Sequence, residues 1–216
     1  MILALVRRRL GAALLAAAAL VVTSSIASSS SAQQCADVEV VFARGSGELP
    51  GLGIVGGPVV NQVRAKLAGR TVASYAVNYA ADVAQLSAGA GATDVTNHIV
   101  AVAARCPETE FVLGGYSQGA SVMDIALGVP NFLGAGKAIP AELQPRIKAV
   151  VLFGNPLALT GGKVTNNRTW GSRTKEFCNL GDPVCAAGFN VLAHVMYAID
   201  GSAAQAATFV AQQFGN

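Results

Sequence analysis

A serine between two glycines is the residue in this sequence with the clearest potential for chemistry. The run Gly115-Tyr116-Ser117-Gln118-Gly119 follows an apolar segment and precedes a helical pattern that begins near residue 120. A G-x-S-x-G run between a strand and a helix is typical of a nucleophile elbow, a sharp turn that exposes the serine hydroxyl. Backbone N–H groups and the positive end of the helix dipole favour a developing oxyanion there. We therefore predict a nucleophile at Ser117 rather than an ordinary Gly-Ser turn.

A serine hydroxyl needs a general base, and the sequence contains two histidines. His98 precedes Ser117 and lies within a helical pattern, which favours a surface or packing role. In an elbow-type hydrolase the acid and then the histidine follow the nucleophile along the chain. His194 is therefore the predicted general base, with a purely structural histidine as the alternative.

The acid that orients this histidine should lie between Ser117 and His194 if that order holds. Asp182 stands between Cys178 and Cys185, in a loop that a disulfide could close. A closed loop would hold the carboxylate rigidly, as a triad acid must be held. Of the other carboxylates in this interval, Asp124 lies two turns along a helix, Glu142 lies in a polar loop and Glu176 lies within a predicted strand.

An oxyanion hole should use the backbone N–H of Gln118, the residue after the nucleophile, and a second donor from a loop after an early strand. Arg44-Gly45-Ser46-Gly47 ends the first apolar strand pattern. Ser46 is the candidate for the second donor, and its hydroxyl could add a hydrogen bond. The alternative is an ordinary turn at a strand end.

The elements that must position these residues alternate between strand and helix patterns. Nearly continuous apolar runs are expected of parallel strands buried on both faces. Strand–helix alternation predicts an open parallel sheet with helices on both faces. The predicted strands are residues 38–43, 72–77, 110–115, 148–154 and 174–178. Helical patterns cover residues 59–67, 95–103, 120–127 and 203–214, and residues 128–147 and 155–173 are expected to be loops with short helical turns.

The first 32 residues have the pattern of a secretory signal peptide. Arg7 to Arg9 precede the uncharged apolar run 10–22, and small residues at Ser30 and Ala32 suit cleavage after Ala32. A membrane anchor is the alternative, but this run is shorter than the roughly 20 residues that span a bilayer. We therefore predict secretion, with one catalytic domain over residues 33–216.

Charge and composition exclude several classes of protein. Three of the fifteen basic residues lie in the predicted signal peptide, so the remaining chain has as many basic as acidic residues, twelve of each. No basic patch remains that would favour nucleic acid. About half of the chain is apolar, 52% by composition, which favours a folded domain over disorder.

Four cysteines follow the predicted signal peptide, and an even number in an exported chain favours two disulfides. Three pairings are possible. Cys178 and Cys185 are close enough to close a short loop, which leaves Cys35 with Cys106. A zinc site is disfavoured because the sequence has no Cys-x-x-Cys motif and contains only two histidines.

These residues together resemble the cutinase family, and in particular the exported cutinase-like esterases of actinobacteria. The resemblance covers nearly the whole chain after the predicted signal peptide. It is carried by Cys35, Arg44-Gly45-Ser46, the elbow at 115–119, the Cys-x-x-x-Asp-x-x-Cys motif at 178–185, and His194.

The resemblance implies a small, essentially lidless α/β-hydrolase that cleaves carboxylic esters without a cofactor or metal. Its central, mostly parallel five-stranded sheet would carry helices on both faces. The implied site residues are the triad Ser117, Asp182 and His194, the oxyanion-hole residues Ser46 and Gln118, and the disulfides Cys35–Cys106 and Cys178–Cys185.

Apolar residues beside the predicted triad favour an acyl ester or lipid substrate, and contact with a lipid or cell-envelope surface. An acetylxylan-type carbohydrate esterase ranks lower, because the single tryptophan, Trp170, lies in a polar loop. Phospholipase, thioesterase and acyltransferase activities could use the same triad, and a non-catalytic cell-surface binding protein is a further alternative. The apolar residues expected to form the walls of the site are Ala80, Ala81, Val83 and Leu86 on one side and Val184, Phe189, Val191 and Leu192 on the other. We also expect the protein to be a monomer.

Overall fold

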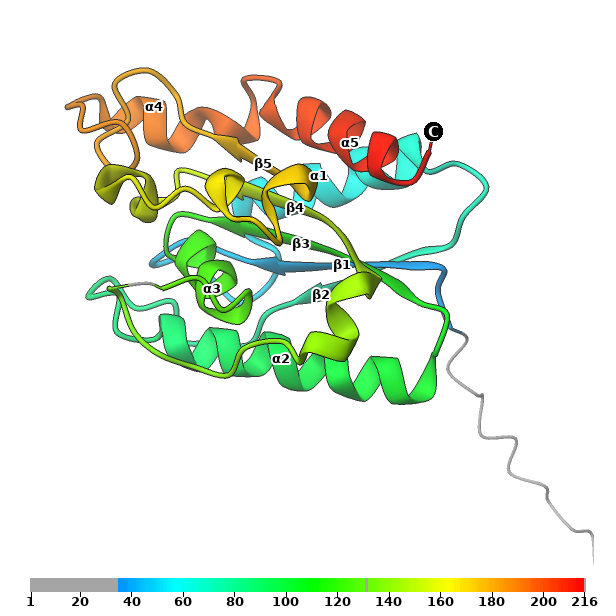
Figure 1. The fold of residues 1–216 in the computed structure, drawn as a ribbon. Helices are drawn as coiled ribbons and strands as arrows, with labels where there is room; N and C mark the ends of the chain where they lie inside the picture. The colour runs from blue at the N-terminus through cyan, green and yellow to red at the C-terminus, as the bar shows by residue number, and fades with distance from the viewer. Residues whose placement is uncertain (1–34, 131, 216) are drawn as a thin grey trace, which may run out of the picture. The chain divides into compact units, whose positions relative to one another are not determined.

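Five parallel β-strands form the sheet at the centre of the fold (Figure 1). The computed structural model describes residues 35–130 and 132–215, so the predicted signal peptide lies outside the described residues. The strands lie in the order β2-β1-β3-β4-β5, and each neighbouring pair is parallel. The bounds are Val38–Ala43 for β1, Val72–Ala76 for β2, Glu110–Tyr116 for β3, Ile147–Phe153 for β4 and Thr174–Phe177 for β5. The predicted five-stranded parallel sheet is confirmed, and each strand end agrees with its prediction to within a residue.

Helices cover both faces of this sheet, as an α/β fold requires. Helices α1 and α5 lie on one face, and α2 and α3 lie on the other (Figure 1). The bounds are Gly53–Lys66 for α1, Ala88–Arg105 for α2, Gln118–Ala126 for α3, Val191–Val195 for α4 and Ser202–Gln213 for α5. Helix α4, of five residues, is the one that the sequence pattern does not predict.

Short 3₁₀ helices occupy the remaining connections, several of them in the two segments predicted to be loops with helical turns. Such turns are common where a chain connects longer elements without space for a full helix. Their bounds are Ala141–Arg146, Pro156–Thr160, Val164–Asn166, Gly171–Arg173 and Met196–Ala198.

Two apolar layers hold the helices against the sheet. Successive residues of a strand point to opposite faces. In β1, Val41 therefore packs in the cluster under α2 and α3, while Phe42 packs in the cluster under α1 and α5. Every residue of β1 is buried as a result. A strand covered on both sides must be apolar nearly throughout, which explains why its sequence lacks the alternation of a half-exposed strand.

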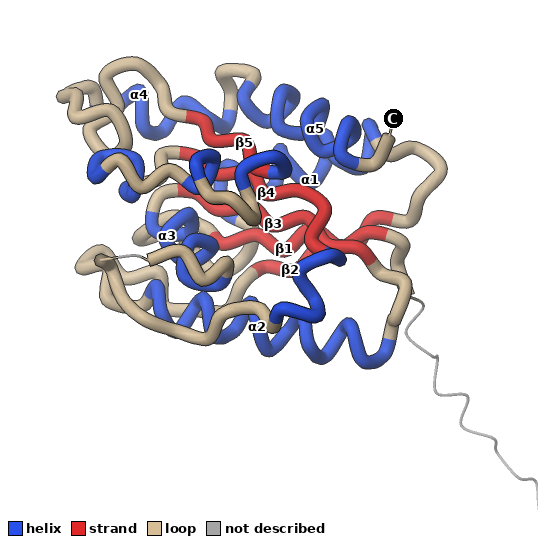
Figure 2. The backbone as a smooth tube through the Cα atoms, in the orientation of Figure 1, coloured by secondary structure: helices blue, strands red, loops and turns tan. Residues whose placement is uncertain are grey.

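The predicted site residues lie where the parallel strands end. Because all five strands run in one direction, their carboxyl ends meet at a single edge of the sheet. Figure 2 shows the long loops gathered at that edge. The segments after β1, β3 and β5 supply Ser46, Ser117 and Asp182.

Both predicted disulfides are formed. Cys35 is bonded to Cys106, which ties the beginning of the described chain to the end of α2. Cys178 is bonded to Cys185, which closes the loop after β5 around Asp182. Within residues 35–130 and 132–215, no helix is both long enough and apolar enough to cross a membrane.

Candidate active site

Ser117 lies in a strained turn between β3 and α3. Its φ of 55° and ψ of −119° are unfavourable for a residue with a side chain, and such strain is concentrated at functional sites. Two glycines make the turn possible. A Cβ atom on Gly115 would lie 2.2 Å from the Gly119 carbonyl oxygen, and one on Gly119 would lie 2.0 Å from that of Ala43. The glycines of the G-x-S-x-G run are therefore required by close backbone contacts.

His194 lies in α4 and faces this serine. The distance between His194 Nε2 and Ser117 Oγ is 3.0 Å. Gly154, which follows β4, leaves room for the imidazole, since a Cβ there would lie 2.6 Å from His194 Cε1. The Tyr116 hydroxyl donates to the His194 carbonyl oxygen at 2.9 Å, which fixes the backbone of α4 beside β3.

Asp182 completes a chain of contacts that begins at Ser117. Its two carboxylate oxygens lie 3.0 and 2.9 Å from His194 Nδ1. The Val184 N–H donates to Oδ1 at 2.7 Å, and the Tyr197 hydroxyl donates to Oδ2 at 2.5 Å. The carboxylate is fully buried, so a serine, an imidazole and a desolvated acid stand in the order required for general-base catalysis.

The ionised form of Asp182 is favoured although the residue is buried. Burial alone would raise its pKa. The hydrogen bonds from Tyr197, His194 and Val184 outweigh this effect and lower the pKa of Asp182 below its ordinary value. Burial and the neighbouring carboxylate raise the pKa of the Tyr197 phenol, which therefore remains a hydrogen-bond donor.

Ser46 and Gln118 also meet, through their side chains. The Ser46 hydroxyl donates to Gln118 Oε1 at 3.2 Å, and Gln118 Nε2 donates to Ser87 Oγ at 3.4 Å. The hydroxyl, predicted to bond an oxyanion, is thus directed at a neighbouring side chain. As the first residue of α3, Gln118 has a backbone N–H with no partner four residues earlier in the helix.

A buried arginine holds the Ser46 loop in place. Arg44 is 3% exposed and donates to backbone carbonyl oxygens of Glu48 and Tyr79, each at 2.8 Å. The Gly47 N–H donates to the Ala81 carbonyl oxygen at 2.7 Å. These bonds join the segment after β1 to the segment after β2.

Exposed apolar side chains stand on both sides of the site, and we call them the apolar rim. One side is the segment after β2 with the neighbouring Ser46 loop, and the other is the segment between Asp182 and His194. Large apolar side chains are rarely this exposed in groups without a binding role. The rim residues are Leu49, Val83 and Leu86 on the first side and Phe189, Val191 and Leu192 on the second. Of the predicted wall residues, Ala81 is buried and Val184 is half-buried.

Several candidate residues lie apart from the site. His98 bonds Glu39 at 3.0 Å and stacks on Tyr75, which is the packing role predicted for it. Among the alternative acids, Glu142 is exposed, while Asp124 and Glu176 both accept from the Asn155 amide at 3.1 Å. Trp170, which the sequence places in a polar loop, is 2% exposed and donates to the Leu127 carbonyl oxygen. It packs in the same core cluster as buried residues of α3.

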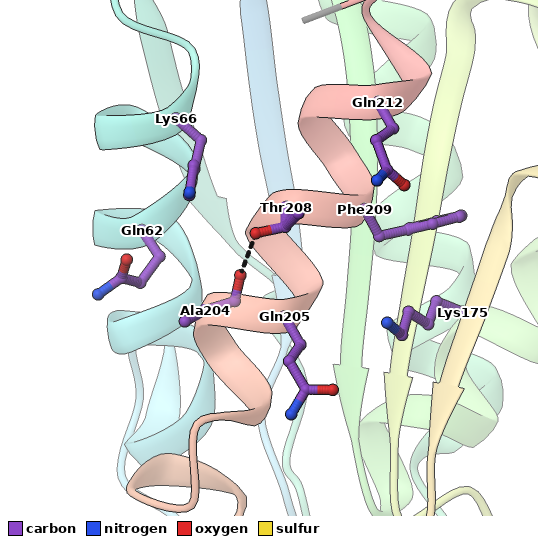
Figure 3. A pocket seen from close by; sticks show the side chains of 8 residues that line it. All are labelled: Gln62, Lys66, Lys175, Ala204, Gln205, Thr208, Phe209 and Gln212. Atoms are coloured by element: carbon purple, nitrogen blue, oxygen red, sulfur yellow. Dashed lines mark hydrogen bonds between the residues drawn. The ribbon is translucent and has the colours of Figure 1, made fainter.

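A shallow pocket over α5 is a separate feature (Figure 3). Its lining combines amides, two lysines and one aromatic ring, and it contains no acid–base pair. Within residues 35–130 and 132–215, no group of three or more His, Cys, Asp or Glu is arranged to hold a metal ion. The pocket is lined by Gln62, Lys66, Lys175, Ala204, Gln205, Thr208, Phe209 and Gln212.

Sequence reasoning misses two residues that contact the site. Tyr197 follows His194 by three positions and bonds Asp182, while Gly154 lies against the His194 ring. The Gly154 signal is visible in principle, because a glycine directly after a buried strand is typical of a close approach. Nothing in the sequence pattern distinguishes Tyr197 from an ordinary core aromatic.

Comparisons with known proteins identify the chains that this sequence and fold are similar to. The family model described as Cutinase matches residues 34–214. A cutinase from Kineococcus radiotolerans is 51% identical over 183 residues, which are 83% of this chain and 62% of that protein. The phospholipase Culp4 of Mycobacterium tuberculosis is 44% identical over 83% of this chain and 79% of its own length. The solved catalytic core of a Trichoderma reesei acetyl xylan esterase superposes with a TM-score of 0.70 and 25% identity, over 83% of this chain and all of that one.

Proposed function

This chain belongs to the cutinase family of carboxylic ester hydrolases, and we propose that it cleaves short- to medium-chain acyl esters by acyl transfer to Ser117. The observation that carries the proposal is the line of contacts from Ser117 Oγ through His194 to Asp182. The chain spans 62% of the length of the Kineococcus cutinase, so the proposal concerns the domain described above.

The reaction would proceed in two steps. His194 Nε2 accepts the proton of Ser117 as the serine oxygen attacks the ester carbonyl. Backbone N–H groups of Gln118 and Ser46 would stabilise the oxyanion, and the imidazolium then protonates the leaving alcohol. Water repeats the sequence on the acyl-enzyme and releases the acid. Asp182 keeps the imidazole oriented throughout and stabilises its charged form.

The apolar rim supports acyl esters, including those at lipid or polyester surfaces, as substrates. A carbohydrate ester remains the second candidate, because an acetyl xylan esterase shares the fold. The buried Trp170 disfavours it, since this ring cannot form a platform for sugars. Phospholipase activity, named for a 44% identical relative, would use the same rim. Thioesterase and acyltransferase reactions would begin from the same acyl-enzyme. We further propose that the enzyme is secreted and monomeric.

Hydrolysis of p-nitrophenyl esters from acetate to palmitate tests this proposal. We expect turnover that peaks between butyrate and octanoate and falls by about 10⁴-fold or more in Ser117→Ala, because the nucleophile is lost. Turnover confined to acetate would favour a carbohydrate deacetylase. Turnover that is equal in Ser117→Ala, or absent with every ester, would overturn the catalytic assignment and favour a binding protein.

A further inference from the structure

The hydroxyl of Tyr197 occupies a fully enclosed position beside the triad acid. Tyr197 is 0% exposed and lies in the 3₁₀ helix Met196–Ala198, directly after α4. Its ring is held by edge-on contacts, with centroids 6.0 Å from Phe153, 6.1 Å from Tyr116 and 6.2 Å from His194. A ring packed on three sides gives its hydroxyl little freedom to move.

The hydrogen bonds at this hydroxyl have a defined direction. The Asn179 N–H donates to the phenol oxygen at 3.0 Å, so the phenol is the acceptor in that bond. Its own hydrogen is therefore available to Asp182 Oδ2 at 2.5 Å, where an ionised carboxylate can only accept. The disulfide sulfur of Cys185 lies 3.5 Å from the same oxygen and closes the remaining side.

Asp182 Oδ2 is shared by the two groups that define the acid's position. Tyr197 reaches this oxygen from the core side, and His194 Nδ1 reaches it at 2.9 Å from the site. The Val184 N–H occupies Oδ1 at 2.7 Å. Short hydrogen bonds to an ionised acceptor are about twice as strong as neutral ones. Loss of the phenol would free the carboxylate to rotate away from the imidazole.

We propose that Tyr197 is a positioning residue for catalysis, which holds the Asp182 carboxylate ionised and aimed at His194. This inference rests on the proposed esterase function. Asn179 and Cys185 of the disulfide-closed loop both contact the phenol oxygen of Tyr197, which lies in the segment after α4. The two segments would therefore position Asp182 together.

The proposal has a pH dependence whose sign follows from the hydrogen bonds. The titratable groups around the phenol and the acid are His194 in α4, Tyr116 in β3, and Asp200, which accepts from the Asn179 side chain at 2.8 Å. Burial raises the pKa of Asp182, and the phenol is the strongest of the groups that lower it. Without the phenol the pKa of Asp182 rises, so on acidification the carboxylate takes up a proton at a higher pH than in the wild type.

The test compares Tyr197→Phe with wild type and with the matched control Tyr75→Phe. Tyr75 also donates its hydroxyl to a carboxylate, that of Asp94, at 3.0 Å. Tyr75 lies in β2, the edge strand of the sheet, which pairs only with β1. We expect kcat for p-nitrophenyl butyrate to fall by about 10- to 100-fold in Tyr197→Phe, the effect of one charge-assisted bond. KM should change less than twofold. Tyr75→Phe should match wild type in both kcat and KM.

Two further measurements keep the test decisive. The ¹³C NMR titration of the Asp182 carboxyl should move to higher pH in Tyr197→Phe, and this readout does not depend on activity. Site-specific 3-fluorotyrosine at position 197, a more acidic phenol of nearly the same shape, should move the titration to lower pH even if the phenylalanine variant fails to fold. An Asp182 titration unchanged in either replacement would overturn the inference. Wild-type turnover that is equal in Ser117→Ala would instead overturn the proposed function, whereas the Asp182 titration tests the contact with Tyr197 separately.

Discussion

The position of His194 depends on the absence of a side chain at Gly154. The glycine has a φ of 56°, and a Cβ there would lie 2.6 Å from Cε1 and 2.8 Å from Nδ1 of the imidazole. No real Cβ contact is this short, so either the ring or the end of β4 must move. A shift of about 1 Å at a catalytic group can reduce the rate by roughly 100-fold.

We therefore expect Gly154→Ala to lower kcat for p-nitrophenyl butyrate by about 100-fold, measured at equal concentrations of folded protein. Gly161→Ala is the matched control, because Gly161 has a similar φ of 77° but open space around its missing Cβ. Both variants should lose about 1–3 kcal/mol of stability through backbone strain. Equal kcat values in the two variants would show that crowding of the imidazole is unimportant.

The sequence identifies some of these residues better than others. Ser117, Asp182 and His194 are predicted because the elbow and the cysteine-flanked acid are local patterns, and the fold type fixes their order in the chain. Tyr197 and Gly154 act through contacts with residues distant in sequence, which no local pattern contains. Their catalytic roles, like those of the triad, remain predictions until the variants are measured.

At the scale of elements, the segment between β5 and α4 is held by the Cys178–Cys185 bond. The central strands β1, β3 and β4 are predicted well because burial on both faces imposes apolar runs. Helix α4 is not predicted, because five residues make little more than one turn and show no periodicity. Its position depends instead on Asn190, whose side chain accepts from the Ala193 N–H at 3.3 Å and caps the helix.

The two disulfides should therefore differ in effect. Removing Cys35–Cys106 opens a loop with a sequence separation of 71, and removing Cys178–Cys185 opens one with a separation of 7. Loop entropy predicts losses of stability of about 4 and about 2.5 kcal/mol, respectively. Activity should follow the opposite order, since only the shorter loop contains Asp182.

Paired serine replacements test this expectation by urea unfolding and by kcat. Cys35→Ser/Cys106→Ser should unfold at lower urea with kcat nearly unchanged. Cys178→Ser/Cys185→Ser should unfold closer to wild type and lose at least about tenfold in kcat. If one pair of replacements caused the larger loss of both stability and kcat, the two disulfides would not have the separate roles expected here.

At the scale of the whole domain, the apolar rim lies on two sides of the site, while Ser117 itself is only 6% exposed. Leu86 is 83% exposed and Phe189 is fully exposed, although each such side chain gains about 1.5–3 kcal/mol when it leaves water. An ester surface that covers the rim would recover this free energy. A soluble ester that enters the site alone would recover little of it.

We expect Leu86→Ser/Phe189→Ser to lower turnover of emulsified tributyrin by about tenfold while p-nitrophenyl butyrate in solution changes less than twofold. Val100→Ser, at an exposed apolar position on α2, is the control and should affect neither substrate. A parallel fall with both substrates would indicate damage to the site itself and contradict a surface-binding role for the rim.

The bond that encloses Asp182 also links activity to the redox state of the surroundings. Thiols are kept reduced in the cytosol of most organisms, so the Cys178–Cys185 bond would not persist there. If the enzyme is exported, as proposed above, a copy still inside the producing cell would lack the bond that holds its acid in place. Formation of this bond outside the cell would then raise its esterase activity.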